Sequence, residues 1–327
     1  MHRTIGIDVS QDFLDVASYD GFTSQVIHYD THNKTTFFKI IKDFSIDKET
    51  LVVMEATGVY HLKLADYFYQ YGYHVAVVNP LKTKRFGEMK FSRVKTDKTD
   101  AKLIAQYGYE QKPKRYQPLP AERTELILIL KGIEDLTEMK LQLFNRLRCL
   151  EKQVSEPQAA KRALLNIQKT LEKELKILQK KGQTLAQSIA EQDYQRLLDI
   201  PGVGPGIAMM IIGYYGNFSD FETANQAVAF AGLNPNPRES GTSVRLQGRI
   251  SKKGHAYLRK MLYMGAVMAK QRNLMCQQLY QRLVEKGKPK KVALVAVANK
   301  LLRQIFAIVK YQRTFEQNYS QKMIENA

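Results

Sequence analysis

Cysteine is scarce in this sequence. Only two occur in 327 residues, Cys149 and Cys276, and both lie in stretches that we expect to be helical. No Cys-x-x-Cys pair and no histidine cluster with zinc spacing is present, so neither a disulfide framework nor a structural zinc is expected. Apolar runs such as MLYMGAVMA, from Met261, are well short of the ~20 residues that a membrane span needs. The N-terminus has no signal-peptide pattern, so we expect a cytoplasmic protein without a membrane partner.

Acidic residues are scarce in the C-terminal third, where no Asp follows Asp220. Residues 238–327 contain 19 Lys+Arg and only 4 Asp+Glu, so most of the formal net charge of +18 lies in this segment. Such a surplus indicates a polyanionic partner, with nucleic acid the first candidate and an anionic membrane surface the second. The alternative is a basic surface that only keeps the protein in solution.

The first 118 residues alternate between short apolar runs and amphipathic segments. RTIGIDVS, FLDVASYD and SQVIHYD are predicted strands, and Asp20-Gly21 predicts a tight turn that makes this start antiparallel. A helix over TTFFKIIKDF follows, capped by Asn33 or Thr35, and then come the strand LVVMEA, the helix HLKLADYFYQYG and the strand HVAVVNP. This is the order of a ribonuclease H-like α/β domain. A helix over DKTDAKLIAQYGYEQ and a proline-bearing linker, KPKRYQPLPAE, complete the segment.

The middle and the end of the chain are predicted to be mostly helical. Residues 119–193 are rich in Leu, Ile, Lys, Glu and Gln, and their apolar residues recur at 3-4 spacing on both sides of Pro157, with Lys140 in one position of the seam. Two long helices would form either an antiparallel hairpin within the chain or a seam for oligomerisation. Within residues 194–327 we expect one irregular polar segment, from Asn234 to Lys253.

Four carboxylates stand where predicted elements begin or end. Asp8 ends the first strand, Glu55 ends the LVVM strand, and Asp97 and Asp100 are three residues apart on one face at a helix start. The two strands would be neighbours in this sheet, which places Asp8 beside Glu55. Because like charges repel, four converging carboxylates need a compensating cation, and an all-oxygen ligand set suits Mg²⁺ or Mn²⁺. Each residue alone could instead be a turn or helix-cap residue.

The stretch LLDIPGVGPGIAMMIIGYYG has the pattern of a helix-hairpin-helix. Gly202 and Gly204 would let backbone N–H groups approach a phosphate, and the following helix would add a favourable dipole. A tight turn between two helices, without a ligand, is the alternative.

A serine lies in a basic, glycine-containing segment further along the chain. Ser240 precedes Gly241, and Arg245, Arg249, Lys252 and Lys253 follow within a few residues. Cations hold a phosphate and favour the deprotonated, nucleophilic form of a hydroxyl. A serine that only donates a hydrogen bond to a phosphate fits the same spacing.

Together these stretches resemble the DEDD transposases of insertion sequences, a group that includes the Piv-type DNA invertases. In chain order the resemblance is carried by GIDVS, MEATGVY, VVNP, KTDKTDA, the PGVG hairpin, FAGLNP, RESGTSVR and SKKGHAYLRKMLYM, and it covers nearly the whole chain. It implies a RuvC-like nuclease domain over 1–118, a helical coiled-coil region over 119–193 and a C-terminal transposase domain over 194–327. The family's acidic residues fall on Asp8, Glu55, Asp97 and Asp100, and its nucleophilic serine falls on Ser240.

The resemblance also implies a mechanism and partners. The serine of one subunit would join the metal-bearing site of another in a dimer or tetramer, giving strand exchange through a covalent phosphoserine. In insertion-sequence members a structured bridge RNA pairs with donor and target DNA, so that pairing selects the sequence and the protein holds the backbone. The expected nucleic-acid ligands are Gly202, Gly204, Arg238, Arg245, Arg249, Lys252, Lys253 and Arg259.

Three other functions fit parts of the sequence. A RuvC-like structure-specific endonuclease would use the carboxylates to activate water, and a DNA invertase would exchange strands without a guide RNA. A non-catalytic nucleic-acid-binding protein would need only the basic segment. An ATP-binding relative of the fold is disfavoured, because no glycine-rich phosphate loop occurs in the first 115 residues.

Overall fold

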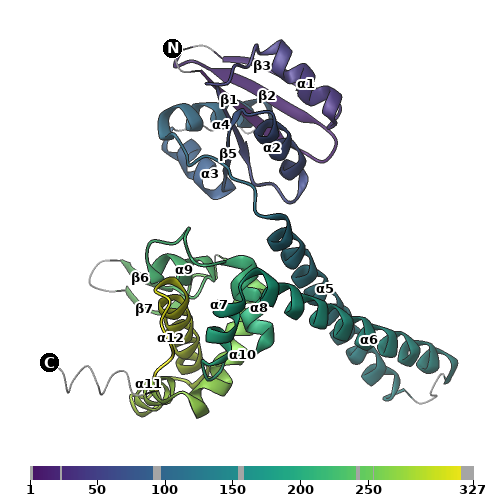
Figure 1. The fold of residues 1–327 in the computed structure, drawn as a ribbon, viewed down its shortest axis with the longest axis vertical. Coiled ribbons are helices and arrows are strands. Elements are labelled where there is room, and N and C mark those ends of the chain that lie inside the picture. The colour runs from purple at the N-terminus through teal and green to yellow at the C-terminus, as the bar shows by residue number, and fades with distance from the viewer. Residues whose placement is uncertain are drawn as a thin grey trace. The chain divides into compact units, whose positions relative to one another are not determined.

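The chain folds into two compact units, Met1–Pro118 and Leu119–Ala327, which we call the N-terminal and C-terminal units (Figure 1). The computed structural model describes residues 3–22, 24–90, 97–153, 158–240, 244–252 and 254–317, without the side chains of residues 97–98, 236–240 and 244–249. The N-terminal unit is a mixed α/β structure with a five-stranded sheet, and helices make up most of the C-terminal unit.

The sheet of the N-terminal unit has the strand order β3-β2-β1-β4-β5. Strands β1 (Thr4–Val9), β2 (Leu14–Tyr19) and β3 (Ser24–Tyr29) pair antiparallel, while β4 (Leu51–Glu55) and β5 (His74–Val78) continue the sheet in parallel from β1. Gly21, with a φ of 105°, lies in the tight connection between β2 and β3, where a side chain would be strained. All five predicted strands are confirmed.

Helices cover both faces of this sheet. On one face, α1 (Lys34–Asp43) and α2 (Tyr60–Gln70) bury Phe37, Ile40, Leu64 and Phe68 against Ile5 and Ile7 of β1. The Asn33 side chain caps α1 by accepting a hydrogen bond from the Thr36 N–H at 3.0 Å, as predicted. On the other face lies α4 (Asp97–Gln111), which packs across β1 and β2. One further helix, α3 (Pro80–Met89), was not predicted from the sequence.

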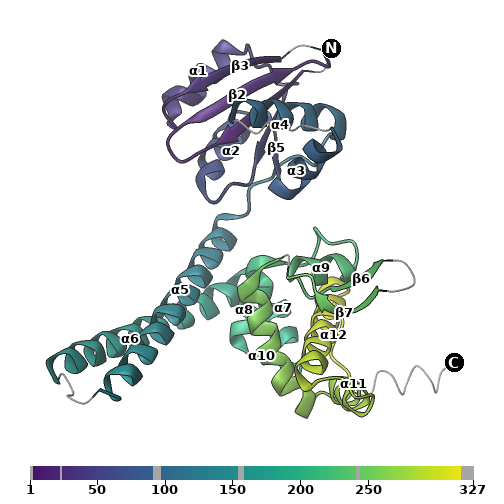
Figure 2. The ribbon, with the colours of Figure 1, turned by 180° about the vertical axis from the view of Figure 1, so that it is seen from behind.

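Two long helices begin the C-terminal unit. Helices α5 (Ala121–Leu150) and α6 (Gln158–Ile189) lie side by side within the chain (Figures 1 and 2). The predicted break at Pro157 lies outside the described residues. One end of the pair is buried, because Leu126, Leu130 and Leu175 belong to the core of the unit. Towards the other end the seam opens into a groove of about 680 Å³ that includes Leu143 and Leu164.

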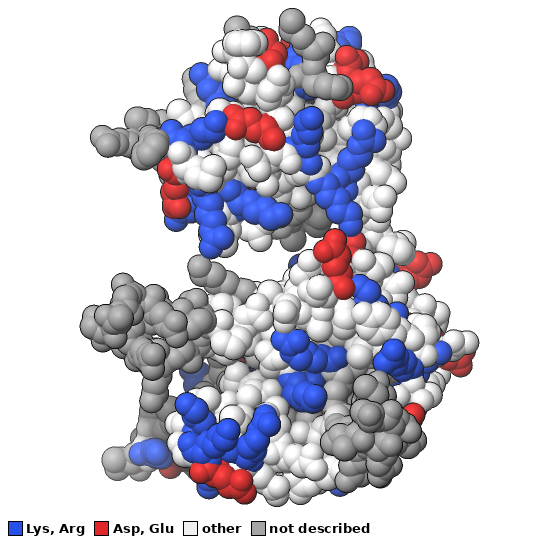
Figure 3. All heavy atoms as spheres, turned by 90° about the vertical axis from the view of Figure 1, so that its left-hand side faces the viewer, with Lys and Arg blue, Asp and Glu red and all other residues white. Residues whose placement is uncertain are grey.

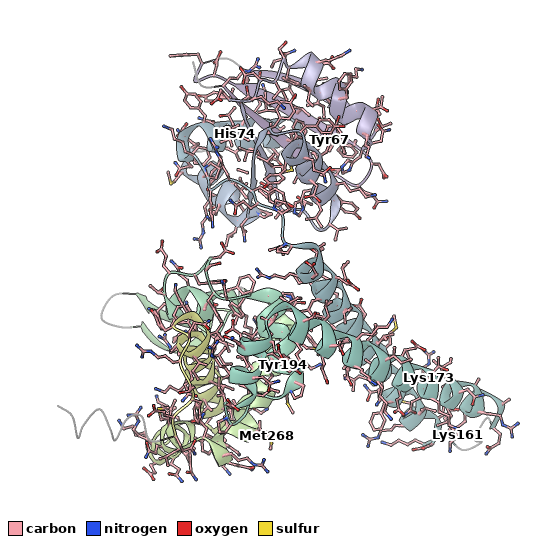
Figure 4. The ribbon with its side chains drawn as sticks, in the orientation of Figure 1. Tyr67, His74, Lys161, Lys173, Tyr194 and Met268 are labelled. Carbon is pink, nitrogen blue, oxygen red and sulfur yellow. The ribbon has the colours of Figure 1, made fainter. Side chains whose placement is uncertain are left out.

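Within the described residues of the C-terminal unit, the core is enclosed by six further helices: α7 (Glu191–Leu198), α8 (Pro205–Tyr214), α9 (Ala224–Phe230), α10 (Ala256–Arg272), α11 (Leu274–Glu285) and α12 (Lys290–Lys310). Tyr194 of α7, labelled in Figure 4, belongs to this core. Helix α12 is long and apolar enough to span a membrane, but 61% of its apolar stretch is buried inside the unit. Its apolar residues are therefore explained by the core.

The segment from Asn234 to Lys253, expected to be irregular, contains a two-stranded antiparallel ribbon. Strands β6 (Pro235–Ser240) and β7 (Val244–Ile250) pair with a register shift between Asn236 and Arg238. Proline has no N–H to give to a ladder, and Pro237 lies within this shift. The prediction was wrong because Pro235, Pro237 and the many polar residues hide the alternation that marks a strand.

Candidate active site

Asp8 and Glu55 lie at the ends of two neighbouring strands. Strands β1 and β4 are parallel, with Ile7 opposite Met54, so the next residue of each strand lies at the same edge of the sheet. Both carboxylates are half-buried. Adjacent strands point their opposed side chains to the same face, so the sheet places this pair as the strand order predicted.

A third acid, Asp15, and a histidine, His28, continue this row across the sheet. Asp8 is opposite Asp15 of β2, and Asp15 is opposite His28 of β3. Asp15 is only 1% exposed, and its Oδ1 lies 2.9 Å from His28 Nδ1, while His28 Nε2 lies 3.1 Å from Asp30. The hydrogen bond to Asp15 raises the pKa of His28, and the charges of Asp15 and Asp30 raise it further against the opposing effect of burial. The protonated, cationic form of His28 is thus favoured beside the buried carboxylate of Asp15.

Glu55 is held by a residue of α3. The Thr83 hydroxyl, 0% exposed, donates to Glu55 Oε1 and also lies 2.9 Å from the Pro80 carbonyl oxygen. Sequence reasoning missed Asp15, His28 and Thr83. An aspartate inside the apolar run FLDVASYD was a usable signal, since a buried charge is rare without a partner. No sequence signal marked Thr83.

Helix α4 lies on the face of the sheet to which Asp8 and Glu55 belong, and its first turn contains Asp100. A Cβ atom on Gly6 would lie 2.2 Å from Ala105 N and 2.4 Å from the Ala101 carbonyl oxygen, so only glycine lets β1 and α4 approach this closely. Asp100, half-buried, directly precedes Ala101. The side chain of Asp97, the first residue of α4, lies outside the described residues. Among the side chains that are described, no group of three or more His, Cys, Asp or Glu is arranged to hold a metal.

The turn between α7 and α8 packs closely against α10. Gly202 has a φ of 104°, and a Cβ atom there would lie 2.6 Å from the Ala269 Cβ and 2.9 Å from the Gly265 carbonyl oxygen. This packing and the positive φ explain why residue 202 is glycine. A Cβ atom on Gly204 would meet no atom within 4 Å. Of the two predicted phosphate ligands, Gly204 therefore lies on the open side of the turn.

Ser240 ends strand β6, opposite Val244. Its side chain, and those of Arg238, Arg245 and Arg249, lie outside the described part of the structure, as does Lys253. Lys252 is exposed, with a φ of 53°.

The base of the β6–β7 ribbon is fixed by hydrogen bonds to five consecutive carbonyl groups. Those of residues 230–234 accept from the His255 N–H, Arg259 Nη1, the Lys252 N–H, Asn299 Nδ2 and the Ser251 N–H. Arg259, a predicted nucleic-acid ligand, donates to the Ala231 carbonyl oxygen at 3.0 Å. At least one N–H of its guanidinium thus donates within the protein, so Arg259 helps to hold the ribbon in place.

Comparison with known proteins identifies the family. A model of the DEDD transposases of IS110 type matches residues 5–155, and a model described as the transposase IS116/IS110/IS902 family matches residues 194–281. The chain belongs to the DEDD-type insertion-sequence transposase family. As a member of this family it is a DNA recombinase, and the family implies a divalent metal ion.

Similar proteins align with this recombinase over nearly its whole length. The pilin gene-inverting proteins of Moraxella lacunata and Moraxella bovis are each 29% identical over 319 residues, which are 95% of this chain and 97% of the relative. The transposase for insertion sequence element IS1111A of Coxiella burnetii is 25% identical over 96% of this chain and 91% of the relative.

Proposed function

We propose that this recombinase exchanges DNA strands by using Asp8, Glu55, Asp97 and Asp100 as a metal-binding site and Ser240 as the nucleophile. The observation that supports this most strongly is the parallel pairing of β1 and β4, which puts Asp8 and Glu55 side by side on the face that α4 covers. The strand order, with three antiparallel strands followed by two parallel ones, is compatible with a ribonuclease H-like, RuvC-like domain.

The carboxylates are suited to hard divalent cations. Asp8 and Glu55 offer oxygen ligands at one sheet edge, and α4 begins with two further acids on the same side of the sheet. Mg²⁺ or Mn²⁺ bound there would draw negative charge from a phosphodiester and stabilise the leaving oxygen. The protein's own part is to fix the oxygens, which the strand pairing does for Asp8 and Glu55 and the Thr83 hydroxyl does for Glu55.

The serine step conserves the energy of the DNA backbone. The Ser240 hydroxyl passes its proton to solvent or a base, its oxygen forms a bond to phosphorus, and the bond from phosphorus to one DNA oxygen breaks. That DNA oxygen takes up a proton from solvent or from the same base and leaves as a hydroxyl. Attack by a hydroxyl of another DNA end on the phosphoserine then restores the backbone and frees Ser240. The proposed phosphate ligands are Gly202, Gly204, Arg238, Arg245, Arg249, Lys252, Lys253 and Arg259.

A structured guide RNA and an oligomer complete this proposal. RNA pairing would supply sequence selection, and the strongly basic C-terminal segment supplies the affinity for backbone phosphates. Two similar proteins that align over 95% of this chain are pilin gene-inverting proteins, which favours site-specific DNA inversion without a guide as the second candidate. Sequencing the nucleic acid that copurifies with the protein separates the two, since one defined structured RNA is expected only for guided recombination.

Two substitutions test the chemistry. Ser240→Ala should abolish strand exchange and the covalent protein–DNA adduct that a nicked substrate traps on a denaturing gel. Asp8→Ala should abolish cleavage in Mg²⁺ or Mn²⁺ while leaving DNA binding intact. Strand exchange by Ser240→Ala at the wild-type rate would contradict the serine assignment. Metal-dependent cleavage by the wild-type protein with neither strand exchange nor a covalent adduct would favour a hydrolytic endonuclease. Full activity of Asp8→Ala would contradict the metal site.

A further inference from the structure

Helix α3 stands at the edge of the sheet where the candidate metal site lies. Strand β5 ends at Val78, which is opposite Glu55 in register, and Asn79 then caps α3 by accepting from the Leu81 N–H at 2.8 Å. In open α/β sheets, ligands bind beyond the carboxyl ends of the strands. Because α3 begins directly after β5, its first turn lies next to Glu55.

The inner face of α3 is fixed to the rest of the unit. Thr83 is buried against Glu55, and Phe86 packs edge-on against Tyr107 with ring centroids 5.4 Å apart. A Cβ atom on Gly87 would lie 2.8 Å from Leu103 Cδ2, so the helix is in close contact with α4. These contacts lie at positions i, i+3 and i+4 and hold one face of the helix inward.

The outer face of α3 carries three cations. Lys82, Lys84 and Arg85 are all exposed. Within the described part of the chain, none of the three takes part in an ion pair or a side-chain hydrogen bond. Lys90, directly after the helix, differs, because it pairs with Glu110 at 2.9 Å. Figure 3 shows Lys and Arg gathered along the lower edge of the N-terminal unit, on the side that carries α3.

We propose that α3 is the DNA-backbone-binding helix of the N-terminal unit. Lys82, Lys84 and Arg85 hold phosphates of the strand whose phosphodiester reaches the carboxylates. Thr83, on the same helix, is a positioning residue that orients the Glu55 carboxylate. This inference rests on the proposed function for the location of the reacting phosphate, but DNA binding by α3 can be tested without any reaction.

The charge of the outer face of α3 favours a nucleic-acid backbone as its ligand. Three exposed cations within four residues of one rigid helix suit a row of phosphates, since lysine and arginine release condensed counterions from the strand when they bind. The enzyme acts on DNA, and the cations flank the residue that contacts Glu55, so the DNA substrate is favoured over RNA.

The test compares two triple variants of the full-length protein. Lys82→Ala/Lys84→Ala/Arg85→Ala removes the cations of α3, and Lys34→Ala/Lys39→Ala/Lys63→Ala removes three exposed cations from α1 and α2, on the opposite face of the sheet. Binding of a duplex DNA oligonucleotide is measured against salt concentration in EDTA, where no metal-dependent reaction occurs. The α3 variant should bind more weakly. Its plot of log affinity against log salt should be less steep, with the magnitude of the negative slope smaller by ~2–3, about one for each phosphate that the variant no longer neutralises. The control should keep the wild-type slope.

Several outcomes would overturn the proposal. An unchanged slope in the α3 variant would do so, as would an equal loss in the control, because net charge alone would then explain the effect. Weaker binding of a single-stranded RNA with unchanged binding of DNA would assign α3 to RNA instead. Lys82→Arg/Lys84→Arg/Arg85→Lys keeps the charges and should keep the slope. Because binding is measured without chemistry, a result for α3 stands even if Asp8→Ala proves active and the proposed function fails.

The positioning of Glu55 has its own test. Thr83→Val replaces the hydroxyl by a methyl group of similar size, and Thr83→Ser retains the hydroxyl. Mg²⁺ should raise the unfolding temperature of the wild-type protein, and Thr83→Val should need about 10–100-fold more Mg²⁺ for the same increase, the usual effect of losing a partner of a metal ligand. Thr83→Ser should restore the wild-type response. An unchanged Mg²⁺ response in Thr83→Val would remove Thr83 from the site.

Discussion

Gly6 is the residue at which strand β1 comes closest to helix α4. Gly6→Ala places a methyl group against the backbone of Ala101 and Ala105, which cannot move without the whole helix. We expect a loss of ~1–3 kcal/mol in the free energy of unfolding, as for other overpacked cores, and slower recombination because α4 carries Asp100. Thermal unfolding and a strand-exchange assay measure the two effects.

Gly204→Ala is the matched control for this substitution. The same methyl group on Gly204 meets no atom within 4 Å, and its φ of −102° suits any residue. Gly204 is also the N-cap residue of α8, where alanine is less favourable than glycine, so the unfolding temperature should fall only slightly and by less than in Gly6→Ala. If the two alanine variants were equally stable, the close approach of β1 and α4 would not be what requires glycine at position 6.

The N-terminal cap of α10 is His255, a residue whose protonation makes the stability of the fold depend on pH. Its Nδ1 caps the helix by accepting from the Leu258 N–H at 3.3 Å, which requires this nitrogen to be unprotonated. Burial, followed by the charges of Lys131 and Arg259, lowers the pKa of His255 below its ordinary value of 6.5. The folded state thus resists a proton that the unfolded state accepts, so the stability that the neutral ring contributes is present above pH ~6.5 and is lost as the pH falls below it.

Thermal unfolding between pH 5 and pH 8, followed by circular dichroism, measures this effect. His255→Asn keeps a good capping side chain that does not titrate. The wild-type protein should lose up to ~0.5–2 kcal/mol at acid pH relative to this variant, the usual contribution of a cap. Parallel pH profiles for the two proteins would show that His255 does not titrate in this range.

At the scale of elements, the α5–α6 seam is buried at one end and open at the other. Leu130 is fully buried in the core of the C-terminal unit, whereas Ile167 is 51% exposed. Leu130→Ala should cost ~2–5 kcal/mol of unfolding free energy, and Ile167→Ala should stay within ~0.5 kcal/mol of wild type. Denaturant titration compares them. A large cost at Ile167 would mean that the open end of the seam is covered in solution.

The elements that could be predicted are those whose pattern is local. The strands β1 to β5 follow from apolar runs and turn residues, and Asn33 marked the start of α1. Helix α3 was missed because it has ten residues and buries only three of them, Thr83, Phe86 and Gly87, so its period is weak. The ribbon of β6 and β7 was missed because its strands are held by pairing with each other and their prolines disguise the alternation.

Only the part of the candidate site that is set by the strand order could be predicted from the sequence. Strand order alone makes Asp8 and Glu55 neighbours, because two adjacent parallel strands end at one edge. The pairing of Asp15 with His28 depends on the register of β2 against β3, and the contact of Thr83 with Glu55 depends on how α3 packs. Such contacts between distant residues are set by tertiary packing, which no local pattern encodes.

For the whole molecule, the proposed reaction joins the serine of one subunit to the carboxylates of another. In a mixed dimer of Asp8→Ala and Ser240→Ala subunits, one site then carries both substitutions and the other carries neither. Mixing the two inactive variants, with subunit exchange, should restore roughly a quarter of the wild-type strand-exchange activity if subunits combine at random. Restoration to no more than background would place the serine and the acids of each site in the same subunit.

The anchoring of residues 230–234 determines how Ser240 can move. Five consecutive carbonyl groups are held at the base of the ribbon, while β6 runs six residues outward from there to the serine at its end. Because these hydrogen bonds oppose sliding of the base, a displacement of the serine within the unit would require the ribbon to rotate about residues 230–234. Six residues at ~3.3 Å each span ~20 Å, so a rotation of ~30° would displace the end of β6 by ~10 Å.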